Sequence, residues 1–262
     1  MVRSLCTAAL IGLLAAPAFA DVTLNSTMTG KGFGKMADGE SVSYISGLKM
    51  RTDSVFGGSP TSIIIDLEAQ KFISINHKKK EALVYDMAKF RQDLDKTLKK
   101  GDTKASLKPN GEKREVSGRA CTGYDMHVAV PFAMGGEGME MTMVMSGPVF
   151  IAKGAPGSAD YAKFYLAAAE KGFIASDPRA AKGAASQTKG MTELYRAIAE
   201  TGGIPYLMET GVKMEGGGPM AGMMGKMMGG SGFTQTITSV ATDPIPADKF
   251  AIPAGYKTKI EK

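Results

Sequence analysis

Short apolar runs that recur about every ten residues constrain the fold of this chain most strongly. Three of them follow one another closely and are rich in β-branched residues: residues 61–67, 71–76 and 81–86. Turn-forming residues separate these runs, and the intervals are too short for helical crossovers between parallel strands. The pattern therefore indicates an antiparallel meander and argues against alternating strand–helix units.

Further segments have the alternating pattern of strands on both sides of this meander. They are residues 22–28, 41–55, 115–117, 122–130, 139–145, 149–152, 204–214 and 233–242. Residues 101–113 are polar and are expected to form a loop. The tail after residue 242 is interrupted by Pro and Gly, and no strand is expected there.

Three segments instead have apolar residues at helical spacing: residues 87–101, 158–172 and 192–201. Asp86 is a candidate N-cap for the first segment and Ser158 for the second. Taken with the strands, they predict one α+β domain with a large curved antiparallel sheet and a few helices on one face.

The first twenty residues have the pattern of a secretory signal peptide. Arg3 gives a positive start, residues 5–14 are apolar, and residues 18–20 form a small-x-small cleavage site that ends at Ala20. The apolar run is too short to anchor the chain in a bilayer. We therefore expect an exported periplasmic protein, residues 21–262, with no transmembrane segment in the mature chain.

Composition and motifs favour a protein that is not an enzyme. The net charge is +6, but acidic residues are interspersed among the basic ones, so no nucleic-acid partner is expected. Cys121 is the single cysteine left after cleavage, and it is expected to be a buried structural residue. Asp125 and His127 share a strand face and are interpreted as solvent-facing. No spaced motif for a hydrolase, a metal site or a cofactor is present.

Several short motifs occur in an order that resembles a known superfamily. They are Leu48 to Arg51, residues 64–66 with 72–75, the spacing of Gly118, Cys121 and Tyr124, and the closing pattern of Pro246, Phe250, Pro253, Gly255 and Tyr256. This order is similar to that of the lipoprotein-carrier superfamily (LolA, LolB and LppX-like) and of a related uncharacterised family. The resemblance implies an incomplete β-barrel with helices as a lid over an apolar cavity that holds acyl chains. It also implies that Arg51 or Lys49 hydrogen-bonds the lid backbone.

Methionines on one strand are the candidate lining of such a cavity. Met139, Met141, Met143 and Met145 alternate with other residues, so their side chains share one strand face. Tyr124, Met126 and Val128 are the candidates on a second strand, with Ile63 or Ile65 opposite them. Methionine is unbranched and adaptable, which suits chains of varying shape, but the same pattern is also that of an ordinary core.

A second methionine-rich feature lies in residues 216–230, which are expected to form a flexible Gly- and Met-rich loop. Its methionines are Met220, Met223, Met224, Met227 and Met228. Thioethers are soft ligands that select Cu(I), so a periplasmic copper-binding protein is one alternative function. The other is an envelope interaction module without a small ligand. The leading hypothesis is a non-enzymatic periplasmic protein that holds an acyl chain, lipid or lipoprotein segment, with an envelope protein as a further partner.

Overall fold

The computed structural model describes residues 21–32, 38–89, 91–92, 104–133, 140–172, 185–216, 223 and 230–261. The predicted signal peptide, residues 1–20, lies outside the described residues. Within these ranges, no helix has the length and apolar character needed to cross a bilayer.

The N-terminal strands form the predicted antiparallel meander. They are β1 (Val22–Lys31), β2 (Gly39–Ser46), β3 (Lys49–Phe56), β4 (Ser59–Asp66), β5 (Lys71–Asn76) and β6 (Glu81–Asp86). Each strand pairs antiparallel with the next one along the chain. Gly57 and Gly58 make the tight turn between β3 and β4, and both have positive φ angles, which glycine adopts without steric cost.

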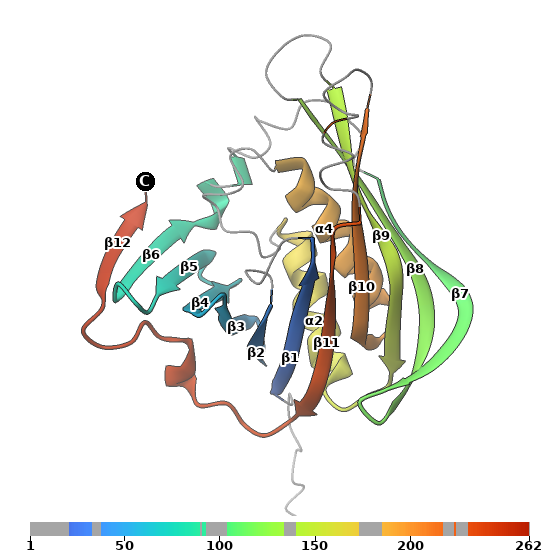
Figure 1. The fold of residues 1–262 in the computed structure, drawn as a ribbon. Helices are drawn as coiled ribbons and strands as arrows, with labels where there is room; N and C mark the ends of the chain where they lie inside the picture. The colour runs from blue at the N-terminus through green and yellow to red at the C-terminus, as the bar shows by residue number, and fades with distance from the viewer. Residues whose placement is uncertain are drawn as a thin grey trace, which may run out of the picture.

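The C-terminal part adds longer strands and the helices. Its elements are β7 (Lys104–Val116), β8 (Arg119–Ala133), β9 (Glu140–Lys153), α2 (Ser158–Glu170), α4 (Ala185–Glu200), β10 (Gly203–Gly216), β11 (Gly232–Ala241), the 3-10 helix η2 (Ala247–Phe250) and β12 (Lys257–Glu261). All twelve strands belong to one sheet in the order β12-β6-β5-β4-β3-β2-β1-β11-β10-β9-β8-β7 (Figure 1). Strand β1 joins the two halves because it pairs with both β2 and β11.

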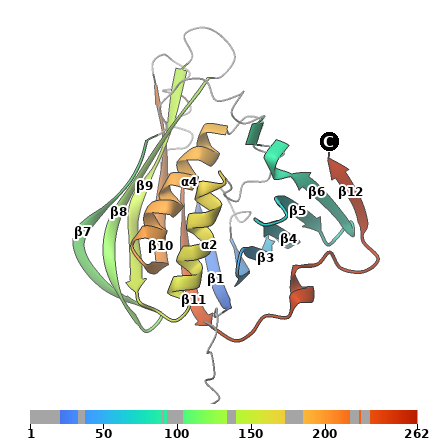
Figure 2. The same cartoon turned by 180° about the vertical axis from the view of Figure 1, so that it is seen from behind.

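The helices α2 and α4 lie against one face of this sheet, which we call the inner face (Figures 1 and 2). Phe164, Leu194 and Ile198 from the helices are at most 1% exposed, and they share one core cluster with strand residues such as Val128. Full burial of a large apolar side chain contributes roughly 1.5–3 kcal/mol. The helices are therefore an integral part of the core.

Tyrosines form much of the contact between the two helices. The rings of Tyr165 and Tyr195 stack with centroids 5.0 Å apart, and the centroid of the Tyr161 ring lies 4.5 Å from that of Tyr165. The Tyr165 hydroxyl also reaches the Sδ atom of Met50 at 3.7 Å. Burial raises the pKa of all three phenols above their usual value. The neighbouring phenols raise the pKa of Tyr161 further, whereas that of Tyr165 is raised by Tyr195 and lowered by its hydrogen bond with Tyr161.

The helix boundaries differ in part from those expected. The backbone N–H of Lys89 donates to Asp86 Oδ1 at 3.1 Å, so Asp86 caps the helical residues that begin at Met87. Ser158 is the first residue of α2 and not its cap, because Gly157 occupies the cap position without a side-chain hydrogen bond. Helix α4 begins at Ala185, well before the expected start at residue 192.

The predicted fold class was wrong. The structure is not an α+β fold with an antiparallel, incomplete barrel and a helical lid, but one mixed sheet that does not close into a barrel, with 61% strand and 19% helix among the described residues. The sheet is mixed because β12 pairs parallel to β6 at the far edge. It remains open because β7 and β12 occupy opposite edges.

The segment from residue 242 to 256, which we call the tail, packs on the opposite or outer face of the sheet at strands β3 to β6. Phe250, Ile252 and Tyr256 of the tail pack against a small second cluster made of Ile64, Ile75 and Ala82. The tail then continues into β12. At its start, the backbone N–H of Ile245 donates to Asp21 Oδ2.

Candidate functional site

The inner face of β8, β9 and β10 carries a continuous set of apolar side chains. In the strand register, Val128 lies opposite Met145, and Met145 lies opposite Val212. Val130, Met143 and Met214 form the next such row. Directly opposed residues of antiparallel strands point to the same side of a sheet. We call this set of side chains the methionine face.

Most of the predicted lining residues lie on this face and are packed into the core. Tyr124, Met126, Val128, Met141 and Met145 are at most 6% exposed, and Met143 is half-buried. Ile65 is also buried on the inner face, at 1% exposure. Met139 lies outside the described residues. The structure thus brings these side chains together on one side of the sheet, as an apolar and adaptable surface.

One polar group on the methionine face stands out. Thr210 of β10 lies between Met208 and Val212 in the strand, and all three side chains are on the same side of the sheet. Thr210 is 5% exposed. Its hydroxyl has no hydrogen-bond partner in the part of the chain that the structure describes. Leaving a buried hydroxyl without a partner costs about 1–3 kcal/mol, so such a group is a candidate contact for a polar ligand atom.

A glycine keeps the space beside Thr210 free of a side chain from β9. Gly147 lies opposite Met126 and therefore on the inner face. A Cβ at Gly147 would come within 2.0 Å of the carbonyl oxygen of Glu209, so only glycine fits the close approach of β9 to β10. Sequence reasoning missed Thr210, because nothing in its local sequence distinguishes it from an ordinary strand threonine.

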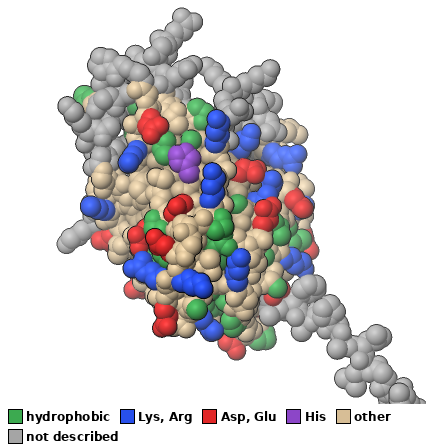
Figure 3. All heavy atoms as spheres, turned by 90° about the vertical axis from the view of Figure 1, so that its right-hand side faces the viewer, with side chains coloured by type: hydrophobic (Ala, Val, Ile, Leu, Met, Phe, Trp, Pro, Cys, Tyr) green, Lys and Arg blue, Asp and Glu red, His purple; other side chains and the backbone are tan. Residues whose placement is uncertain are grey.

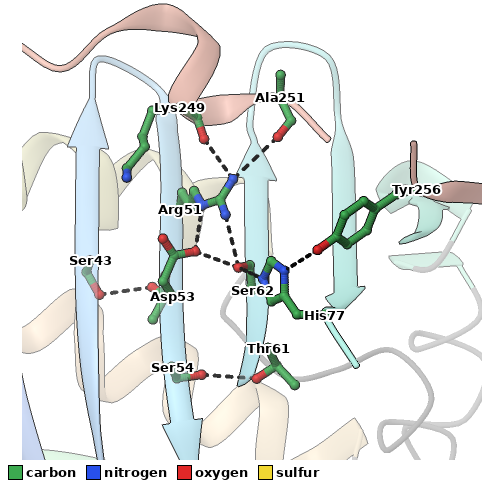
Figure 4. Close-up of polar contacts among 11 residues, drawn as sticks. Ser43, Arg51, Asp53, Ser54, Thr61, Ser62, His77, Lys249, Ala251 and Tyr256 are labelled. Atoms are coloured by element: carbon green, nitrogen blue, oxygen red, sulfur yellow. Dashed lines mark hydrogen bonds and ion pairs between the residues drawn. The ribbon is translucent and has the colours of Figure 1, made fainter. Parts of the chain in front are cut away.

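The outer face of β3, β4 and β5 carries a connected polar network (Figure 4). Arg51 Nε donates to Asp53 Oδ1 at 2.6 Å, and its Nη2 donates to Ser62 Oγ at 3.1 Å. The Ser62 hydroxyl contacts both Asp53 Oδ1, at 2.5 Å, and His77 Nε2, at 2.6 Å. His77 Nδ1 in turn lies 2.8 Å from the Tyr256 hydroxyl.

A proton arrangement with a neutral His77 satisfies every bond of this network. An ionised Asp53 only accepts, so Ser62 donates its proton to Asp53 and accepts one from His77 Nε2. His77 Nδ1 then accepts from the hydroxyl of Tyr256. Ser62 therefore has no free base to activate it, and it is fully buried. Despite its serine, histidine and aspartate, the network has the geometry of a structural clamp and not of a nucleophilic site.

Arg51 connects the network to the tail. Its Nη1 donates to the carbonyl oxygens of Lys249, at 3.0 Å, and Ala251, at 3.4 Å. The resemblance implied that Arg51 or Lys49 holds the backbone of a helical lid. The structure instead places Arg51 against the tail on the outer face, while Lys49 pairs with Asp66 at 3.3 Å near the surface.

Of the methionines predicted for the alternative metal site, the structure describes one. Met220, Met224, Met227 and Met228 lie outside the described residues, and Met223 is 61% exposed. The copper hypothesis stays a prediction. Among the described residues, no group of three His, Cys, Asp or Glu side chains is arranged to hold a metal ion.

Cys121 is buried on β8, and Asp125 and His127 lie on the outer side of the same strand. Cys121 is 3% exposed, and its burial raises the pKa of the thiol, which keeps it protonated and unreactive. Asp125 and His127 are exposed, as expected, and Asp125 accepts a hydrogen bond from Asn110. Figure 3 shows basic and acidic side chains intermixed on the side where β7, β8 and β9 lie.

Comparison with known proteins adds little. No known family model matches the chain, and no curated protein matches it. One similar solved structure is that of an uncharacterized conserved protein from Thermus thermophilus, with 6% sequence identity over 93% of this chain and 92% of that chain. Its TM-score of 0.40 is too low to carry an argument. The resemblance to lipoprotein carriers therefore stays a prediction.

Proposed function

We propose that this protein is a non-enzymatic periplasmic binding protein that holds the acyl chain of a lipid or lipoprotein against the methionine face. The observation that carries the proposal is the apolar inner face of β8–β10 with the unpartnered hydroxyl of Thr210 within it. The periplasmic location rests on the signal-peptide pattern of the first twenty residues.

The chemistry of the methionine face suits such a ligand. A buried acyl chain gains about 0.8 kcal/mol per CH₂, so a long chain offsets an association cost of roughly 4–15 kcal/mol with few polar contacts. Methionine side chains have three rotatable bonds, which lets the face repack around a chain that enters between α4 and the sheet. Thr210 supplies a hydrogen bond for an ester, carboxyl or hydroxyl group of the ligand.

The test uses the chain from residue 21, stripped of bound lipid and titrated with cis-parinaric acid, a fluorescent C18 fatty acid. We expect saturable binding that Met143→Glu abolishes, because the substitution places a charge on the half-buried inner face. Thr142→Glu is the matched control, since Thr142 is the adjacent half-buried residue on the other side of β9. Near-ultraviolet circular dichroism shows whether each variant keeps its fold.

Thr210→Val separates binding from folding. Replacing an unpartnered buried hydroxyl with a methyl group is expected to raise the free energy of unfolding by about 1 kcal/mol. The same change removes the ligand contact, so the affinity for the probe is expected to fall about tenfold. Absence of binding to the unmodified protein, or equal losses in Met143→Glu and Thr142→Glu, would overturn the proposal.

A further inference from the structure

The inner face of β1–β5 differs sharply from the methionine face. Two rows of hydroxyl-bearing side chains cross these strands at opposed register positions. The first row contains Ser26, Ser41, Ser54 and Thr61, and the second contains Ser43 and Thr52, which Ile63 of β4 separates from Ser74 of β5. We call them the hydroxyl rows. Apart from the buried Ser26, their members are half-buried, so their oxygens are partly accessible.

Hydrogen bonds join the hydroxyls in pairs across neighbouring strands. Ser26 and Ser41 lie 2.8 Å apart, and Ser43 and Thr52 lie 2.9 Å apart. Ser54 and Thr61 form a third pair at 3.1 Å (Figure 4). A pair of hydroxyls has two protons and uses one between its members, so each pair keeps one donor and several lone pairs for another molecule.

The hydroxyl rows carry no charged side chain, which restricts what they would bind. The outer face of the same strands carries Lys49, Arg51, Asp53 and Asp66, so charge is common on these strands but is confined to the other side. The rows themselves offer an anionic phosphate no cation to pair with, while Lys78 Nζ lies 3.4 Å from Ser59 Oγ, two residues before Thr61. The rows match a neutral ligand that itself has many hydroxyls.

The hydroxyl rows are continuous with the methionine face. Met28 follows Ser26 on the inner side of β1 and lies opposite Gln235 of β11. Gln235 in turn lies opposite Met208 of β10, next to Thr210 on the same side. A molecule with an apolar chain on the methionine face would therefore reach the hydroxyl rows with its polar end.

We infer that the hydroxyl rows are the headgroup subsite of the bound amphiphile, and that this headgroup is neutral and polyhydroxylated, as in a glycosyl group. The inference rests on the proposed function, because it assigns the polar end of the same ligand. The hydroxyl pairs sit on strands whose backbones lie about 4.8 Å apart, so they would bridge successive ligand hydroxyls.

The test compares three amphiphiles with the same twelve-carbon chain and different headgroups, each below its micellar concentration. They are dodecyl maltoside, dodecylphosphocholine and dodecanoate, titrated into the chain from residue 21 by calorimetry. We expect dodecyl maltoside to bind at least tenfold more tightly than the other two. In Ser54→Ala with Thr61→Val, both members of one pair are replaced, so no hydroxyl is left unpaired and the fold is preserved. This variant should lose the preference for maltoside and keep its affinity for dodecanoate.

Ser239→Ala is the control, because Ser239 is an exposed hydroxyl paired with Asn25 away from the hydroxyl rows. It should bind all three amphiphiles like the unmodified protein. Equal affinity for the three headgroups would overturn the headgroup inference while the proposed function stands. Retention of the maltoside preference in the double variant would also overturn it. Binding of none of the three would instead contradict the proposed function itself.

Discussion

The two faces of the sheet are covered in different ways. On the inner face, α2 and α4 contribute large apolar side chains such as Phe164 and Leu194 to an extensive core. On the outer face, the tail covers a small apolar cluster and is held by the hydrogen bonds of Arg51 and Tyr256. Apolar burial thus fixes the helices, whereas the tail depends on a few directional polar contacts. The two attachments should respond differently to pH and to single substitutions.

The largest expected effect is alkaline destabilisation of the helix-covered side. The pKa values of Tyr161, Tyr165 and Tyr195 are raised by burial, so the folded state keeps these phenols protonated. Their contribution is fully present below the unfolded pKa of about 10 and is lost as pH rises above it. At pH 11 each phenol that remains protonated in the fold lowers the free energy of unfolding by about 1.4 kcal/mol, so the upper limit for all three is about 4 kcal/mol. Urea unfolding at pH 8 and pH 11 measures the difference.

Tyr165→Phe is the control for this effect. It removes one ionisable group from the stacked rings, so the loss of stability between pH 8 and pH 11 should shrink by up to about 1.4 kcal/mol. Absorbance at 295 nm follows the titration directly. Ionisation of all eight tyrosines near pH 10 in the folded protein would contradict the prediction.

The next effect concerns the tail. Arg51→Met removes the partner of Asp53 and the donor to the carbonyls of Lys249 and Ala251. Breaking one side of a largely buried ion pair leaves the other charge uncompensated, and we expect a loss of about 3 kcal/mol in the free energy of unfolding. Limited proteolysis should show earlier cleavage in the tail than in the helices.

Lys49→Met is the matched variant, since Lys49 lies on the same strand and the same face but is 42% exposed and pairs with Asp66 near the surface. Exposed ion pairs contribute about 0–1 kcal/mol, so this change should be nearly neutral. Equal effects of the two substitutions would show that the network does not hold the tail.

The smallest expected effect is that of Tyr256→Phe. The change removes only the hydroxyl that is hydrogen-bonded to His77 Nδ1, so about 1 kcal/mol of stability should be lost. Tyr44→Phe is the comparison, because the ring that faces the Lys249 ammonium at 4.3 Å is kept. Urea unfolding of both variants should give a larger loss for Tyr256→Phe, and the opposite order would contradict the role given to the clamp.

Local periodicity predicted much of the sheet but not its edges. The strands β5 and β6 have the expected bounds because each is a β-branched run between clear turns. Strand β7 was expected to be a loop over most of its length because its sequence is charged and contains Pro109. Charged residues and proline are common on edge strands, where they prevent pairing with another chain. Strand β12 was missed for the same reason, and its parallel pairing with β6 depends on the path of the tail, which no local pattern encodes.

For the candidate site, the sequence predicts which residues of one strand point to the same side of the sheet, but no more than that. Alternation places Tyr124, Met126 and Val128 on one side of β8, and the structure buries all three. Alternation cannot say which residues meet across distant strands. His77 and Tyr256 are 179 residues apart in the chain, and their contact arises only once the tail has crossed the sheet. Thr210 was missed because the absence of a partner is a property of packing and not of sequence.

The pairing of β1 with β11 has a consequence for how the chain reaches this structure. Asn25 and Ser239 are 214 residues apart, yet their side chains hydrogen-bond across the centre of the sheet. During synthesis, β1 is made early, but β11, which pairs with one of its edges, is made only after almost the whole chain. That edge of β1 stays unpaired until then. Such non-local pairing slows folding and leaves a strand edge available for wrong partners. For a chain that the sequence predicts to be exported, this delay favours translocation before the sheet is complete.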